Sequence, residues 1–137
     1  MIKRVVLTVC AILLLFAVPA CEGIKLAASF DENEVIDRAK AAVEVINTLD
    51  YDAMCAEFRD DLQEQVSADS LKTAWEPLLT AARTFKEYKK VTTAGVKVKE
   101  TGEDGAIVTL TCAYENSTLT YTISLDTNLE VVGMWLK

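Results

Sequence analysis

The stretch from Ile107 to Leu125, IVTLTCAYENSTLTYTISL, alternates apolar and polar residues on both sides of a short polar turn at 115–117. Alternation with a period of two is typical of strands that bury one face. So short a link between two strands requires them to pair antiparallel. The stretch therefore predicts a β-hairpin, with these inward side chains: Val108, Leu110, Cys112, Tyr114, Leu119, Tyr121, Ile123 and Leu125.

Two further strands flank this hairpin. From Tyr88 the period is already two, up to a turn at 102–105, and a turn at 126–128 precedes a last strand at 129–136. Short links between four consecutive strands predict an antiparallel meander. The last strand is apolar on both sides, which leaves two alternatives: a cover by the chain's own loops, or a homodimer across the sheet. Its two sides are predicted as Val131, Gly133 and Trp135, and as Val132, Met134 and Leu136.

Three helices are predicted before the sheet. Apolar residues recur at helical spacing after Asp31, Asp50 and Ser67, residue types that commonly cap helices. Helices followed by strands predict an α+β domain, with three helices packed on one face of a four-stranded antiparallel meander. The second helix is predicted to continue through Leu62. The apolar positions are, in the first helix, Val35, Ala39, Ala42, Val43, Ile46 and Leu49; in the second, Tyr51, Met54, Cys55, Phe58 and Leu62; and in the third, Leu71, Ala74, Trp75, Leu78, Ala82 and Phe85.

The first twenty-one residues have the build of a bacterial export leader. Lys3 and Arg4 precede an apolar run at 5–18, which is shorter than the roughly 20 residues of a membrane-spanning helix. Small residues then lead to Cys21, a pattern that resembles the lipobox of bacterial lipoproteins. We expect a signal peptide at 1–20, a lipidated Cys21 with a tether at 21–30, and a single domain at 31–137. Plain cleavage near Ala20 and an uncleaved anchor are the alternatives.

Charge and composition exclude several classes of protein. After Ala20 the chain has 12 basic and 21 acidic side chains, a balance of −9, and the whole chain has no histidine. Such a domain is a poor nucleic-acid binder and lacks the commonest general base and metal ligand. Asp126, Asn128 and Glu130 have the opening spacing of a calcium loop but lack its glycine and closing glutamate, so they predict a hairpin turn. We expect no metal and no cofactor.

The two cysteines after Cys21 are both predicted to point inward. Cys55 shares a helix face with apolar residues, and Cys112 shares the inward side of its strand. A disulfide between Cys55 and Cys112 would persist in an exported protein and would close a long loop. The alternative is two separate buried thiols.

Several short segments resemble DUF3887, a family of small bacterial lipoprotein domains of unknown function. They are Asp50-Tyr51, Phe58-Arg59-Asp60, Leu71 with Trp75, and the closing segment 126–135. The resemblance covers roughly 35–137 and departs from the family pattern at Pro77 and Asn128. It implies a cone-shaped helix-and-curved-sheet fold like those of the nuclear transport factor two and cystatin-like superfamilies. It carries over no catalytic residue.

Relatives with this fold often hold a pocket on the concave side of the sheet, where Tyr114, Tyr121 and Trp135 would lie here. These rings would otherwise fill the core. We expect a lipid-anchored extracytoplasmic binding or accessory protein without catalytic activity, held at the cell membrane by its lipid and acting through an unknown protein partner. The alternative is a small-molecule binder or isomerase-like enzyme that uses the pocket.

Overall fold

The computed structural model describes residues 25–97 and 101–137. Within them, four helices precede four strands that pair in the order β1-β2-β3-β4, each antiparallel to the next. This confirms the predicted α+β class and the meander. The elements are α2 (Glu32–Asn47), α3 (Tyr51–Glu57), α4 (Asp60–Gln63), α5 (Ala68–Ala82), β1 (Phe85–Lys97), β2 (Asp104–Tyr114), β3 (Thr118–Leu125) and β4 (Val131–Leu136).

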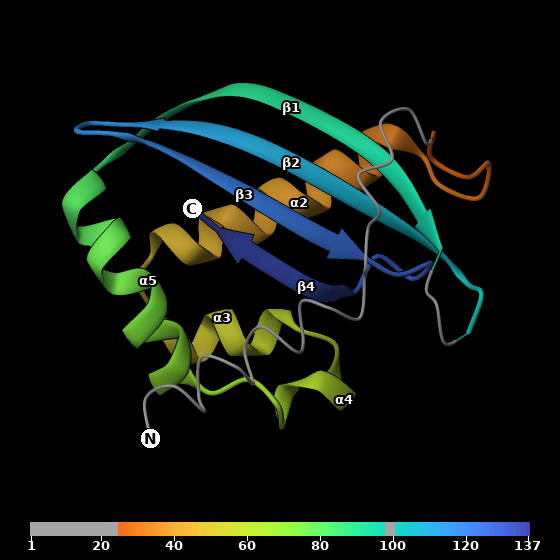
Figure 1. Ribbon diagram of the computed structural model, residues 1–137, viewed down its shortest axis with the longest axis horizontal. Coiled ribbons are helices and arrows are strands. Elements are labelled where there is room, and N and C mark those ends of the chain that lie inside the picture. The colour runs from red at the N-terminus through yellow and green to blue at the C-terminus, as the bar shows by residue number, and fades with distance from the viewer. Residues whose placement is uncertain (1–24, 98–100) are drawn as a thin grey trace.

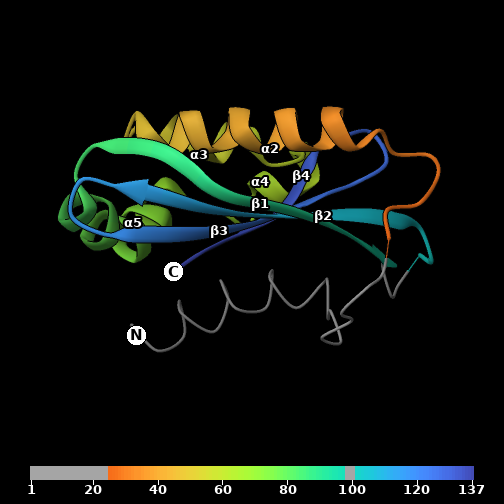
Figure 2. The ribbon, with the colours of Figure 1, turned by 90° about the horizontal axis from the view of Figure 1, so that it is seen from above.

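Helix α2 lies across one face of the curved sheet, which we call the inner face (Figures 1 and 2). Helix α5 lies at the end where β1 begins, and α3 and α4 lie beyond β4. The core fills the space between these elements, so the apolar stripes of the helices face the inward side chains of the hairpin. Each fully buried Val, Leu, Ile, Phe or Met side chain contributes about 1.5–3 kcal/mol to the stability of the fold by leaving water.

Three helices begin at the residues that the sequence predicted. Asp31 Oδ1, Asp50 Oδ1 and Ser67 Oγ each accept a hydrogen bond from the backbone N–H three residues later, at 3.1 Å. Each bond satisfies an N–H group that has no partner inside its helix. Local capping chemistry therefore sets where α2, α3 and α5 begin.

The predicted second helix is in fact two helices. At Phe58 the backbone becomes extended and forms an isolated parallel bridge with Val131, and Arg59 N donates to Val131 O at 2.8 Å. The helix restarts as α4. Phe58 and Leu62 are both buried, so the periodicity predicted their burial correctly but not the break between them. Pairing with a distant strand outweighs the local helical preference.

The register of the sheet also corrects the two sides predicted for β4. Leu125 pairs with Val131 and Ser124 pairs with Gly133, so one residue of β4 is extra at this point. A bulge of this kind reverses the alternation of side chains. Val131 therefore lies on the inner face with Leu125, whereas Gly133 and Trp135 lie on the outer face.

Candidate functional site

A hollow of about 370 Å³ lies at the end of the domain where α2 and α5 end and β1 begins. We call it the α2–α5 hollow. Part of its lining is apolar and part is polar, and the polar part includes one cationic side chain. The lining residues are Asn47, Leu49, Leu79, Arg83, Thr84, Phe85 and Tyr114.

Two of these residues have a left-handed backbone that side chains disfavour. The φ angle is 62° at Leu49 and 68° at Arg83. Such conformations cost about 1–3 kcal/mol each and occur mainly where the surrounding structure enforces them. Here the turn between β2 and β3 fixes the chain after α5, because Asn116 N donates to Ala82 O at 3.0 Å and Glu115 N donates to Thr84 O at 2.8 Å.

A chain of hydroxyl groups connects the hollow to the core. The hydroxyls of Tyr114 and Tyr121 lie 2.6 Å apart, and Tyr114 donates to Asn47 Oδ1. Tyr121 is therefore the donor to Tyr114. Burial is the main cause that raises the pKa of both phenols. Both phenols are thus neutral at physiological pH, and they hold the Asn47 side chain in one orientation.

The structure brings together two of the three side chains predicted to line a pocket. Tyr114 lines the α2–α5 hollow, and Tyr121, only 1% exposed, lies behind it in the core. Trp135 does not join them, because it pairs with Thr122 on the outer face and is 42% exposed. The register shift before β4 places it there. The tyrosines therefore serve a hollow at the end of the sheet and not one along its concave side.

The two cysteines of the domain are free thiols in the structure. Cys112 is buried, and Cys55 is partly exposed. Burial raises the pKa of the Cys112 thiol to about 11 and also raises that of Cys55. The structure thus has the separate thiols that were the alternative to a disulfide.

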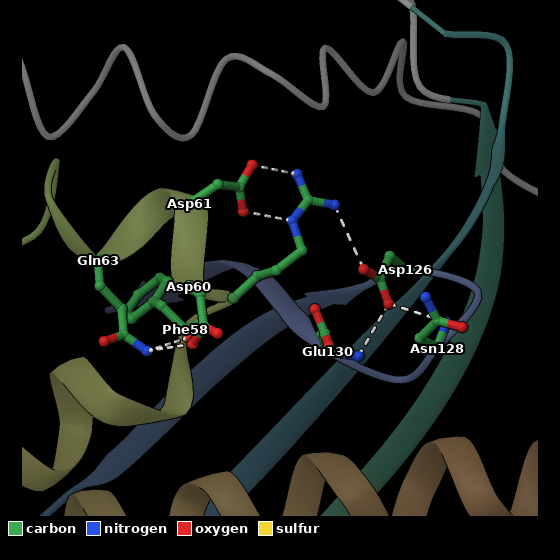
Figure 3. Close-up of polar contacts among 8 residues, drawn as sticks. Phe58, Asp60, Asp61, Gln63, Asp126, Asn128 and Glu130 are labelled. Carbon is green, nitrogen blue, oxygen red and sulfur yellow. Dashed lines mark hydrogen bonds and ion pairs between the residues drawn. The ribbon is translucent and has the colours of Figure 1, made fainter.

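The turn between β3 and β4 lies at the opposite end of the domain (Figure 1). There Arg59 contacts both Asp61 and Asp126, two of the carboxylates labelled in Figure 3. Its guanidinium donates to both carboxylate oxygens of Asp61, at 2.6 and 2.9 Å, and to Asp126 Oδ2 at 3.3 Å. Asp126 is buried, and its Oδ1 accepts from the backbone N–H groups of Asn128 and Glu130, both at 2.9 Å. We call this set of contacts the Arg59 clamp.

The clamp explains the carboxylates that resembled the start of a calcium loop. Asp126 Oδ1 is occupied by two backbone donors and its Oδ2 by Arg59. These contacts form a hairpin turn, as predicted. Hydrogen bonds from Arg59 lower the pKa of Asp61. Among residues 25–97 and 101–137, no three Asp, Glu, Cys or His side chains gather closely enough to hold a metal ion.

A second hollow, of about 380 Å³, lies beside the clamp, but both of its guanidiniums, those of Arg38 and Arg59, are already paired with carboxylates. Arg38 Nη2 donates to Glu57 Oε2 at 2.7 Å, and Arg38 Nε donates to Leu129 O at 3.1 Å. This second contact supports the left-handed backbone of Leu129, where φ is 61°. Since both guanidiniums near this hollow are already paired, it offers a ligand less than the α2–α5 hollow does.

Sequence reasoning missed Asn47 and Arg83 in the hollow and the contact of Arg59 with Asp126. Asn47 and Arg83 lie at helix ends and carry no motif. Arg59 and Asp126 both belong to segments that resemble DUF3887, but nothing in the sequence indicated that these segments touch. The one signal that could have indicated this contact is that both segments belong to the same family resemblance.

The predicted leader, Cys21 and the tether as far as residue 24 lie outside the described residues. Among the helices that the structure does describe, none is long and apolar enough to cross a membrane.

The fold defines the protein as an α+β domain with a helix-covered antiparallel meander. A family model described as "Protein of unknown function (DUF3887)" matches residues 39–134, and the chain therefore belongs to this family. The chain is also similar to a solved structure, the NMR structure of a protein from Ruminococcus gnavus ATCC 29149. That likeness has a TM-score of 0.70 and 24% identity, and covers 81% of this chain and 95% of the other, so it shows a shared fold. No curated protein matches the chain.

Proposed function

We propose that this protein is a lipid-anchored binding module at the extracytoplasmic face of the cell membrane, and that it binds without catalysing a reaction. The predicted leader at 1–20, directly before Cys21, supports the location. Lipid chains on one cysteine would tether the domain durably, since two or more acyl chains together hold a protein at a bilayer. The α2–α5 hollow supports the binding role.

The observation that carries this proposal is the composition of the hollow's lining. Its titratable side chains, within the described part of the chain, are Tyr114 and Arg83. Burial raises the pKa of Tyr114, and a guanidinium is a permanent cation. A general acid or base needs a pKa near the working pH. Neither group meets that need, which favours binding over the isomerase-like alternative.

Mass spectrometry of the amino terminus tests the anchor. We expect the mature protein to begin at Cys21 with acyl chains attached, and Cys21→Ser to abolish both acylation and recovery in the membrane fraction. Cys10→Ser is the matched control, because Cys10 lies within the predicted leader and should leave processing unchanged. An unmodified Cys21 thiol or a retained leader would overturn the location.

The absence of catalysis is tested on any compound that shifts the Asn47 side-chain amide signals in an NMR spectrum. We expect each such compound to be recovered chemically unchanged after long incubation with the protein. Conversion of a compound by the protein, lost in Tyr114→Phe, would establish the enzyme alternative.

A protein partner, or a second copy of the chain, would most readily meet Trp135. Exposed tryptophans are enriched at the centres of protein interfaces, and Trp135 is the most exposed aromatic side chain among the described residues. A photo-crosslinking residue at position 135 should capture a partner in intact cells. The same residue at Lys72, on the exposed side of α5, is the control. A dimer-sized product would identify the second copy, and no product at position 135 would refute this surface.

A further inference from the structure

The α2–α5 hollow presents hydrogen-bond donors that have no partner in the described protein. Tyr114 occupies Asn47 Oδ1, while Asn47 Nδ2 has no acceptor among residues 25–97 and 101–137. Arg83 likewise forms no side-chain hydrogen bond or ion pair with these residues. No carboxylate lines the hollow. Asn47 and Arg83 therefore give the lining an amide and a cationic guanidinium whose donors are free to bind a ligand.

The apolar part of the lining suits a compact hydrocarbon group. It is formed by Leu49, Leu79 and Phe85. Leu49 is 50% exposed and so has apolar surface that a ligand could cover. The ring of Phe85 is fixed edge-to-face against Tyr114, with centroids 5.6 Å apart. A volume of about 370 Å³ falls within the range of small-molecule sites.

We propose that the α2–α5 hollow binds a small monocarboxylate with an apolar body. The apolar body packs against Leu49, Leu79 and Phe85, and the carboxylate accepts hydrogen bonds from Arg83 and from Asn47 Nδ2. This inference rests on the proposed binding function and names its ligand class. Because the domain as a whole is acidic, long-range attraction does not bring the anion in. Recognition depends on the charge-assisted bonds inside the hollow.

Matched probes distinguish recognition of the carboxylate from packing of the apolar body. Phenylpropionate, phenylpropanol and phenylpropylamine share one apolar body and differ in their polar end. Each is titrated into the full-length chain in detergent while NMR follows the Asn47 side-chain amide and the Arg83 Nε–H signals. We expect phenylpropionate to bind at least about tenfold more tightly than the other two, as a hydrogen bond to a charged group predicts.

Two variants remove the donors without emptying the hollow. Asn47→Asp keeps the oxygen that accepts from Tyr114 but replaces the amide with a second carboxylate oxygen. Arg83→Gln removes the charge and keeps a side chain on the same backbone. Each should weaken phenylpropionate about tenfold or more, and Asn47→Asp should reverse the preference toward phenylpropylamine. Lys86→Gln is the control, because Lys86 is exposed on β1 and does not line the hollow. It should change binding less than about twofold.

The possible outcomes have different consequences. If no probe moves the two signals, the hollow is not a binding site and the proposed binding role at this place fails as well. If all three bind equally, the hollow binds ligands but the carboxylate preference is wrong. If phenylpropionate is preferred and both variants leave its affinity unchanged, Arg83 and Asn47 do not recognise it. If phenylpropionate is preferred and both variants weaken its binding, octanoate and N-acetylphenylalanine distinguish two sources of the carboxylate, an acyl chain or a peptide carboxyl terminus, and tighter binding of either supports the proposal.

Discussion

Replacing Asp126 with alanine should destabilise the domain more than any other change in the Arg59 clamp. The substitution removes the acceptor of three bonds, two from the backbone N–H groups of Asn128 and Glu130 at 2.9 Å and one from Arg59 at 3.3 Å. Hydrogen bonds to a charged acceptor contribute about 1.5–3 kcal/mol each. Asn128 and Glu130 are exposed, so water can replace part of what their N–H groups lose. We therefore expect a total loss of roughly 2–4 kcal/mol in the free energy of unfolding.

Asp61→Ala is the matched control, because Asp61 binds the same guanidinium through two shorter contacts. Its side chain is 60% exposed. Exposed ion pairs contribute about 0–1 kcal/mol, so this variant should cost less than about 1 kcal/mol despite its better geometry. Asp126→Asn should fall between the two. It keeps an oxygen for the backbone N–H groups and loses the charge that faces Arg59, at a cost of about 1 kcal/mol.

Urea unfolding followed by tryptophan fluorescence measures all three variants. Trp75 is buried in the core, so its emission reports loss of the fold. The reasoning fails if Asp61→Ala costs as much as Asp126→Ala, because contact geometry would then matter more than burial. It also fails if Asp126→Ala costs less than about 0.5 kcal/mol, the range of an ordinary surface substitution.

Three further predictions concern single side chains. The hydroxyl of Tyr51 is buried without a partner among the described residues, so Tyr51→Phe should raise the free energy of unfolding by up to about 1 kcal/mol; destabilisation in urea would instead indicate a bound water. Burial raises the pKa of Tyr88 from 10.0 to about 12. The stability that its neutral form contributes is present below pH 10 and is lost as pH rises through about 12. An alkaline titration followed by both absorbance and circular dichroism would detect this loss. Loss of the fold well below pH 10 would contradict this account. A thiol reagent should modify the partly exposed Cys55 before the buried Cys112 in the folded protein, and peptide mass spectrometry showing the reverse order would contradict the burial of Cys112.

The elements of this fold that the sequence predicted are those set by local chemistry. A capping oxygen and the N–H groups it satisfies lie within one helical turn, so Asp31, Asp50 and Ser67 could be identified without any tertiary information. The hairpin around 115–117 is similar, because one face of each strand is apolar and the link is short. A slip of one residue would turn every apolar side chain to the other face, so the alternation and the short turn together set the register.

The features that the sequence did not predict depend on contacts between distant segments. The helix break at Phe58 results from its bridge with Val131. The face of Trp135 depends on an extra residue in β4, and a strand that is apolar on both sides gives no sign of such a bulge. The α2–α5 hollow requires the ends of α2 and α5 to meet, and only packing decides that. Tyr114 was identified because aromatic residues are recognisable on a strand, whereas Asn47 and Arg83 were not.

The segments that carry much of the family resemblance and the residues of the proposed binding site lie in different parts of the domain. The segments Phe58-Arg59-Asp60 and 126–135, which carry much of that resemblance, meet at the clamp, where they close a turn and end a helix. Such contacts maintain a fold. The hollow lies where α2 and α5 end, and Figure 1 shows these helix ends at the opposite end of the domain from the turn between β3 and β4. The residues proposed to hold its ligand, Asn47 and Arg83, lie outside those segments. A chain could therefore keep the clamp and change the residues at positions 47 and 83, retaining the fold while recognising a different ligand. Membership of the family consequently indicates how this protein folds, and the chemistry of the hollow has to indicate what it binds.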